Sequence, residues 1–268
     1  MNTGRSNTRR NRNIGTAKQG HGQNNKFEIP THNYPNGVVF HFENLKNYRS
    51  VARVVNCYPI TLLVEETRNN CVHACTIDDI THVLRNVPVA DLEGISLIIL
   101  RQPKRKEEII NPAWGRCVQY AVIGEFYGSA IFLEAVVLSE PMRWSKSLSP
   151  DLQAELERLK NDGHSVTTTK RHHFVSANLD SVRATQLYRT LLHELGHHVD
   201  RKRDEELFDT KPSKEKEVFA HRYADELQDE LKQKGILPFE RIFDIESLES
   251  DKLRVVDFGA IEQSLDAR

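Results

Sequence analysis

The chain has 268 residues, of which 38% are hydrophobic and 28% charged, and its formal net charge is −1. This length allows one sizeable core, or a core with a small companion domain, and the near-zero charge excludes a general attraction to nucleic acid or membrane surfaces. No apolar run reaches the ~18–20 residues of a membrane-spanning helix, and the N-terminus lacks the apolar stretch of a signal peptide, so a cytoplasmic protein is expected.

Residues 1–30 are predicted to form a disordered, basic N-terminal tail. Residues 1–26 contain six Lys or Arg and no acidic residue, and they offer too little apolar surface to offset the entropy of ordering. Two interpretations stay open. The segment is a solubilising tail, or it is an arm that binds nucleic acid or another anionic partner, although it has no aromatic residue to stack on bases.

Residues 31–92 are predicted to form an accessory α/β segment, either a layer on the main domain or a small separate domain. The pattern indicates strands at 38–42 and 60–64 and a short helix at 45–55. A further helix is expected at 77–84, capped by Thr76 with Asp79 in its first turn. This segment contains no catalytic pattern.

The cysteines do not indicate a disulfide scaffold, because there are only four and they are scattered. Cys71, His73 and Cys75 raise the question of a structural metal. Their spacing is not that of a Cys-x-x-Cys knuckle, and no second ligand pair follows. We therefore expect small buried side chains in a reducing compartment.

Residues 93–268 are predicted to form the main domain, of the α+β class. Apolar strands are expected at 95–100, 118–123 and 130–138, the last two as a hairpin. A helix should begin with Ser149 as cap and Pro150 in its first turn, with Leu152, Leu156 and Leu159 as its apolar stripe. The extended run 166–175 follows and is expected to border the functional cleft.

The sequence His193-Glu194-Leu-Gly-His197 has the spacing of a zinc site on one helical face. Residues four apart project side by side on an α-helix, so the two imidazoles can take adjacent corners of a tetrahedral ion. Glu194 lies beside that pair, where it can act as a general base toward water. The apolar stripe of this helix is expected to run from Ala184 to Val199, with Asp180 or Ser181 as N-cap.

A second helix is expected downstream to bring the third ligand. Ala220, Ala224, Leu227 and Leu231 recur at helical spacing, and Glu217 lies one turn before Ala220 on the same stripe. A carboxylate on the apolar side of a helix is costly unless it is paired or binds a metal. Glu217 is therefore the favoured third ligand.

Together these motifs resemble the gluzincin metallopeptidases. Glu217-x-x-Ala220-His221-x-Tyr223-Ala224 is most similar to the compact ImmA/IrrE-type enzymes, whose motif is Glu-x-x-Ala-Asn-x-Phe-Ala. The resemblance covers roughly residues 94–234 and implies a zincin-like fold, in which a small mixed or antiparallel sheet packs on the His-Glu-x-x-His helix. It also implies Zn²⁺ held by His193, His197 and Glu217, with Glu194 as the base. His221 stands where those enzymes have Asn, so the residue that orients the histidines stays open.

Several alternatives stay open beside these assignments. The third ligand could instead be His221, Asp200 or Asp204, whereas a metzincin arrangement is excluded because position 203 is Arg. Asp200 could also orient one of the ligand imidazoles. A donor that stabilises the oxyanion is not assigned by the sequence. The candidates for that role are His221, Tyr223, Tyr127, His172 and His173.

The sequence thus predicts a zinc-dependent peptidase, a hydrolase acting on a protein or peptide whose identity and cleavage specificity stay open. Two other classes of protein compete with it. One is a zinc-stabilised interaction module that hydrolyses nothing. The other is a nucleic-acid-associated factor acting through residues 1–26. Oligomeric state and the role of the tail are not predicted.

Overall fold

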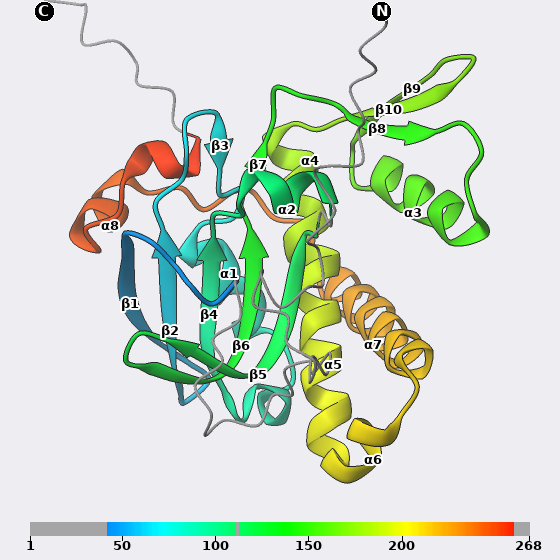
Figure 1. The fold of residues 1–268 in the computed structure, drawn as a ribbon. Coiled ribbons are helices and arrows are strands. Elements are labelled where there is room, and N and C mark those ends of the chain that lie inside the picture. Colours follow the sequence, from blue (N-terminus) through cyan, green and yellow to red (C-terminus); the bar gives the residue numbers. More distant parts are fainter. Residues whose placement is uncertain (1–41, 111–112, 260–268) are drawn as a thin grey trace, which may run out of the picture. The chain divides into compact units, whose positions relative to one another are not determined.

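The computed structural model describes residues 42–110 and 113–259, all of which belong to one compact unit spanning Val39–Arg268. Figure 1 shows its secondary structure. The predicted tail at 1–30 and the predicted strand at 38–42, apart from Phe42 in a turn, lie outside the described residues. Within them, no helix is long and apolar enough to cross a membrane.

A five-stranded mixed sheet forms the centre of this unit. The outer pairs β1–β2 and β5–β6 are antiparallel, whereas β2–β4 and β4–β6 are parallel. In spatial order the strands are β1 (Tyr48–Val55), β2 (Tyr58–Glu65), β4 (Ile95–Arg101), β6 (Phe126–Glu134) and β5 (Gly115–Ile123). The strand β5 is therefore an edge strand of the sheet.

Both faces of the sheet are buried, which explains the nearly continuous apolar runs of its central strands. In β4, Ile98 and Leu100 join the core on the helical face, while Leu97 and Ile99 join a second core on the opposite face. The opposite core also receives Phe42 and Leu45 from the segment before β1. The architecture is α+β with a mixed sheet.

The strand β1 corrects the prediction of a helix at 45–55. Val51 and Val55 are buried and Val54 is 67% exposed, which is the alternation of a strand that pairs with β2. Because β1 and β2 lie in the same sheet as β4, β6 and β5, residues 48–65 contribute to the central layer. The helix α1 (Ile77–Arg85) begins as predicted, with Thr76 and Asp79 in a reciprocal capping box.

One long helical run packs on the sheet (Figure 1). It comprises α4 (Leu179–Ala184), a π-helical segment η4 (Thr185–Thr190) and α5 (Leu191–Arg203). Its N-cap is Asn178, in a capping box with Ser181, so neither Asp180 nor Ser181 is the cap. The predicted stripe is confirmed from Leu187 to Val199 and is only partly buried at Ala184.

Two further helices follow α5 along the chain, α6 (Glu205–Thr210) and α7 (Ser213–Gln233). The predicted stripe of α7 is confirmed, because Ala220, Ala224, Leu227 and Leu231 are all buried. The α7 helix packs along α5 (Figure 1). Beyond α7 the chain contributes α8 (Ile245–Ser250) and a 3₁₀ turn, η5 (Val255–Phe258), to the same core.

Residues 139–176 form a lobe with its own small sheet. That sheet has the order β8 (Met142–Ser145), β10 (His172–Ser176), β9 (Ser165–Thr168), and it packs on α3 (Pro150–Asn161), which Ser149 caps as predicted. Leu156 and Leu159 are buried against the sheet, but Leu152 is 46% exposed and leaves the predicted stripe.

Shorter elements complete the described residues. The strands β3 (Cys71–Val72) and β7 (Val136–Val137) pair with each other, and α2 (Arg105–Ile110) follows β4. A 3₁₀ turn, η3 (Val89–Leu92), lies before β4 and is held to α5 by His198, whose Nε2 is 2.9 Å from the carbonyl oxygen of Glu93.

Candidate metal centre

The helix α5 brings His193 and His197 together. Their Nε2 atoms are 3.1 Å apart and their ring planes are nearly perpendicular, at 88°. This follows from helical spacing, because residues i and i+4 lie one above the other on the same face. Both side chains are mostly buried, with 16% of their surface exposed.

The helix α7 adds Glu217 to this pair. Its Oε2 is 3.3 Å from Nε2 of His193, and its Oε1 is 3.6 Å from Nε2 of His197. The Glu217 side chain is half exposed, whereas the next residues on its stripe, Ala220 and Ala224, are buried. The carboxylate therefore stands at the rim of the α5–α7 contact, with its oxygens turned toward both imidazoles.

Small residues set how closely the two helices approach. A Cβ atom added to Gly196 would lie 3.0 Å from Cα of Ala220 and 3.1 Å from its carbonyl oxygen. Larger side chains at either position would separate the helices. Since Gly196 lies between the two histidines in sequence, and Ala220 is one turn after Glu217, this contact fixes the distance from the carboxylate to the imidazoles.

The three side chains fit a zinc ion in spacing and in chemistry. Two ligands at 2.0–2.1 Å from a tetrahedral ion are about 3.3–3.4 Å apart, which lies within the observed distances of 3.1, 3.3 and 3.6 Å. Among the described residues, only these three form a group of His, Cys, Asp or Glu able to hold a metal. Two imidazoles and one carboxylate are a common donor set of catalytic zinc.

The ionisation of these groups suits metal binding. Burial, together with the neighbouring His193, lowers the pKa of His197 to about 4. A hydrogen bond from His193 lowers the pKa of Glu217. At neutral pH, His197 thus has a lone pair free for a metal and Glu217 is a carboxylate, which are the protonation states that ligands need.

Glu194 is buried next to this group, between α5 and the edge strand. Its carboxylate accepts a hydrogen bond from the backbone N–H of Cys117 in β5. Burial nevertheless raises the pKa of Glu194 to about 7, while the charge of His193 opposes the shift. A carboxylate with such a pKa can both accept and return a proton near neutrality.

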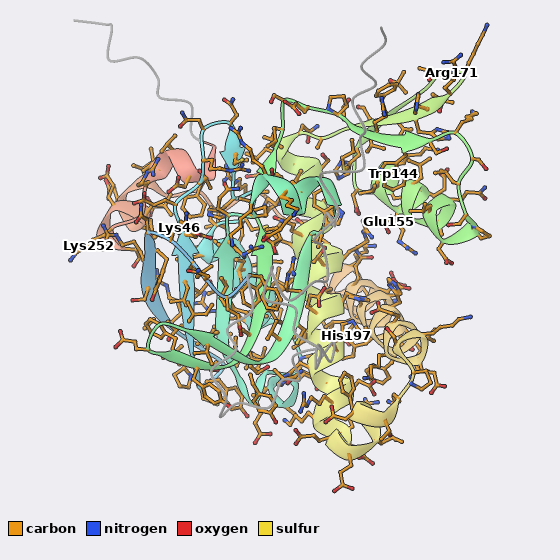
Figure 2. All side chains as sticks on the ribbon, in the orientation of Figure 1. Lys46, Trp144, Glu155, Arg171, His197 and Lys252 are labelled. Atoms are coloured by element: carbon orange, nitrogen blue, oxygen red, sulfur yellow. The ribbon has the colours of Figure 1, made fainter. Side chains whose placement is uncertain are left out.

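A cavity of about 230 Å³ opens beside His193 and Glu194. Its other walls come from four parts of the chain. They are Trp114 with the first residue of β5, Glu155 and Arg158 of α3, residues 188–190 of η4, and His221 and Asp225 of α7. Figure 2 shows Glu155 on the side of α3 and His197 where α5 faces α7. The small lobe therefore supplies one wall of the candidate site.

Of the alternative ligands, His221 is the one that lies next to the cluster. Its ring centroid is 4.4 Å from that of His193, and it faces the cavity. Asp200 instead forms an ion pair with Lys211 at 2.5 Å and makes no hydrogen bond to an imidazole of the described residues. Asp204 caps α6 by accepting from the backbone N–H of Leu207. The structure brings neither aspartate into the ligand group.

The structure also separates the candidates for oxyanion stabilisation. The Tyr223 hydroxyl donates to Asp91 at 2.6 Å and is committed there. Tyr127 is 60% exposed and stacks on Tyr120. Only His221 lines the cavity among these candidates.

His172 and His173 lie on β10 in the lobe and do not line the cavity, so the run 166–175 does not border it as predicted. Figure 2 shows the nearby Arg171 at the tip of the β9–β10 hairpin, far from His197.

The Cys71, His73 and Cys75 side chains are all buried and point to different partners. Cys71 accepts from Arg68, His73 Nε2 is 2.7 Å from the carbonyl oxygen of Glu65, and Cys75 donates to Gln186. No metal group forms from them within the described residues.

Sequence reasoning missed three features of the site. These are the Cys117 amide, the Trp114 wall and Arg158. The pair Glu155 and Arg158, three residues apart on a predicted helix, was visible as a local ion pair. The sequence does not show that this pair lies beside His193, because the position of the pair depends on how the lobe folds back toward α5.

Comparisons of the chain with protein-family models, with curated protein sequences and with solved structures found no match.

Proposed function

We propose that this protein is a zinc-dependent peptidase of the gluzincin type. The observation that carries the proposal is the convergence of His193, His197 and Glu217 from two helices, with Glu194 buried beside them. The resemblance of both motifs to gluzincins supports the same assignment, as does the mixed sheet packed on α5. A zincin-like fold is part of this proposal.

Each residue has a distinct role in the proposed reaction. His193, His197 and Glu217 hold the zinc ion, which, when bound, lowers the pKa of a water molecule toward neutrality and polarises a carbonyl group. Glu194 takes a proton from the attacking water and returns it to the departing amine. The Cys117 amide orients the Glu194 carboxylate for both transfers. His221 is the best-placed donor to the carbonyl oxygen as negative charge develops there.

The edge strand offers a means of holding an extended substrate. β5 lies at the end of the strand order and its Cys117 N–H points to Glu194. A peptide that adds to such an edge gains main-chain hydrogen bonds that do not depend on its sequence. The peptide would then pass next to the general base.

The decisive experiment combines metal analysis of the purified full-length protein with cleavage of a peptide library. Wild type should contain about one zinc ion per chain and cleave peptides. Glu194→Gln should keep the zinc and lose about 10²–10⁴-fold in cleavage rate, since it retains the shape of the side chain but cannot accept a proton.

A matched pair of variants on α7 tests the third ligand. Glu217→Gln should lose zinc, whereas Glu215→Gln, an exposed acid on the same helix, should keep it. His221→Gln should keep zinc and slow cleavage. Zinc loss in His221→Gln but not in Glu217→Gln would reassign the ligand. Bound zinc with no cleavage of any peptide would favour a non-catalytic module instead.

A further inference from the structure

The cavity beside His193 and Glu194 is small and lined by charged groups. At about 230 Å³ it lies below the roughly 300–1,000 Å³ of pockets that hold whole small-molecule ligands. It is therefore suited to a single side chain. Trp114 offers an aromatic surface, and Arg158, His221 and Asp225 offer polar groups.

Arg158 is held in a fixed orientation by a chain of ion pairs. Its Nε donates to Glu155 Oε2 at 2.8 Å. Glu155 is itself held by Arg189, whose two terminal nitrogens donate to it at 3.1 and 3.2 Å. Arg189 Nε in turn donates to Asp162 at 2.7 Å. Two arginines and two carboxylates thus neutralise one another around a partly buried network.

Within this network Arg158 donates only through its Nε atom. Its two terminal nitrogens donate to no residue in the described part of the chain, although its side chain lines the cavity. Asp225, the acidic group on the opposite wall, is exposed, and no hydrogen bond within the described residues orients it. A preorganised guanidinium fork binds a carboxylate better than a mobile carboxylate binds a cation, because less freedom is lost.

The position of Glu194 indicates which substrate residue enters the cavity. In the proposed reaction Glu194 returns a proton to the departing amine, and Glu194 lines the cavity. The residue that carries that amine therefore places its side chain there. We infer that the cavity selects substrates with Glu or Asp directly after the scissile bond, through Arg158. This inference rests on the proposed function, but carboxylate binding by Arg158 can be measured without hydrolysis.

The test uses full-length zinc-loaded Glu194→Gln protein and two short capped peptides that differ only in Glu against Gln at one position. Calorimetry should show the Glu peptide binding about tenfold more tightly, the amount expected for one charge-assisted pair in a partly exposed site. Arg158→Gln should abolish the difference, and Arg158→Lys should retain part of it because it keeps the charge without the fork. Lys160→Gln, on the same helix and exposed, should leave it unchanged.

The ratio of the two affinities separates recognition from structural damage, since a disrupted wall weakens both peptides equally. Equal binding of Glu and Gln peptides, or a preference that survives Arg158→Gln, overturns the inference even if the wild type cleaves both. A preference lost in Arg158→Gln together with no cleavage by the wild type overturns the peptidase assignment and leaves the carboxylate site in place.

Discussion

Two arginines on the same helical run form ion pairs that differ in how deeply they are buried. Arg183, on α4, faces the body of the protein and forms a two-point ion pair with Asp79, at 2.9 and 3.0 Å. Both partners are buried, Asp79 completely. Arg189, on η4, faces the lobe and binds Glu155 and Asp162, with 19% of its side chain exposed. Both arginines pair with carboxylates, but Arg183 and its partner are more deeply buried than Arg189.

That difference in burial determines how much each ion pair contributes to stability. A buried charge that loses its partner cannot be hydrated, so the Arg183 pair is part of the core. It also donates to Tyr188 and to the backbone of Phe239, which ties α4 to the segment after α7. The Arg189 network is near water, so its contribution is smaller and depends on salt. The lobe is therefore attached more weakly than α4.

The largest effect is expected for Arg183→Met. Asp79 would keep its backbone hydrogen bonds from Thr76 and Ile242 but lose its ion-pair partner at zero exposure, which should lower the free energy of unfolding by about 3–5 kcal/mol. Urea unfolding monitored by circular dichroism measures this loss. The double variant Arg183→Met/Asp79→Asn should recover part of it, because no buried charge remains. A loss under 1 kcal/mol in the single variant would show that the buried pair contributes little to stability.

A smaller effect is expected for Arg189→Gln. Removing this cation should reduce stability by about 1 kcal/mol at low salt and by less in 1 M NaCl, because screening already weakens the wild-type network. Hydrogen exchange should increase within residues 139–176 and stay unchanged in the central sheet. Uniform faster exchange across the whole unit would contradict a weakly attached lobe.

The smallest effect concerns pH. His164, buried between the lobe and η4, has its Nε2 3.0 Å from the Thr185 hydroxyl, and burial lowers its pKa. The unfolded chain therefore binds a proton first as pH falls below the ordinary histidine pKa of about 6.5, so stability falls in that direction until the folded pKa is passed. The wild type should lose more stability than His164→Gln between pH 7.5 and 5. Equal losses would exclude His164 as a source of pH dependence.

Local spacing was enough to predict which three side chains meet at the centre of the candidate site. His193 and His197 follow from helical periodicity, and Glu217 from its place on the stripe of Ala220 and Ala224. These residues are four or fewer apart within each helix, so their relative positions are determined by the helix itself. The pairing of the two helices was implied by their small residues, and Gly196 against Ala220 is the contact that provides it.

The rest depended on contacts between distant segments. The stretch 45–55 was predicted as a helix, although its β-branched Val51, Val54 and Val55 also suit a strand, and pairing with β2 decides between the two. The N-cap Asn178 lies two residues before Asp180 and three before Ser181, the expected caps. Arg158 belongs to a helix that was correctly predicted, but the sequence does not show that α3 lies against the cavity.

The close contact of Gly196 with Ala220 sets the separation of α5 and α7. This contact sets the gap between two imidazoles on one helix and a carboxylate on the other. A methyl group added at position 196 would lie 3.0 Å from Cα of Ala220, so it would push α7 away and move Glu217 from the two imidazoles. The metal affinity of the proposed site would thus depend on a residue that touches no metal.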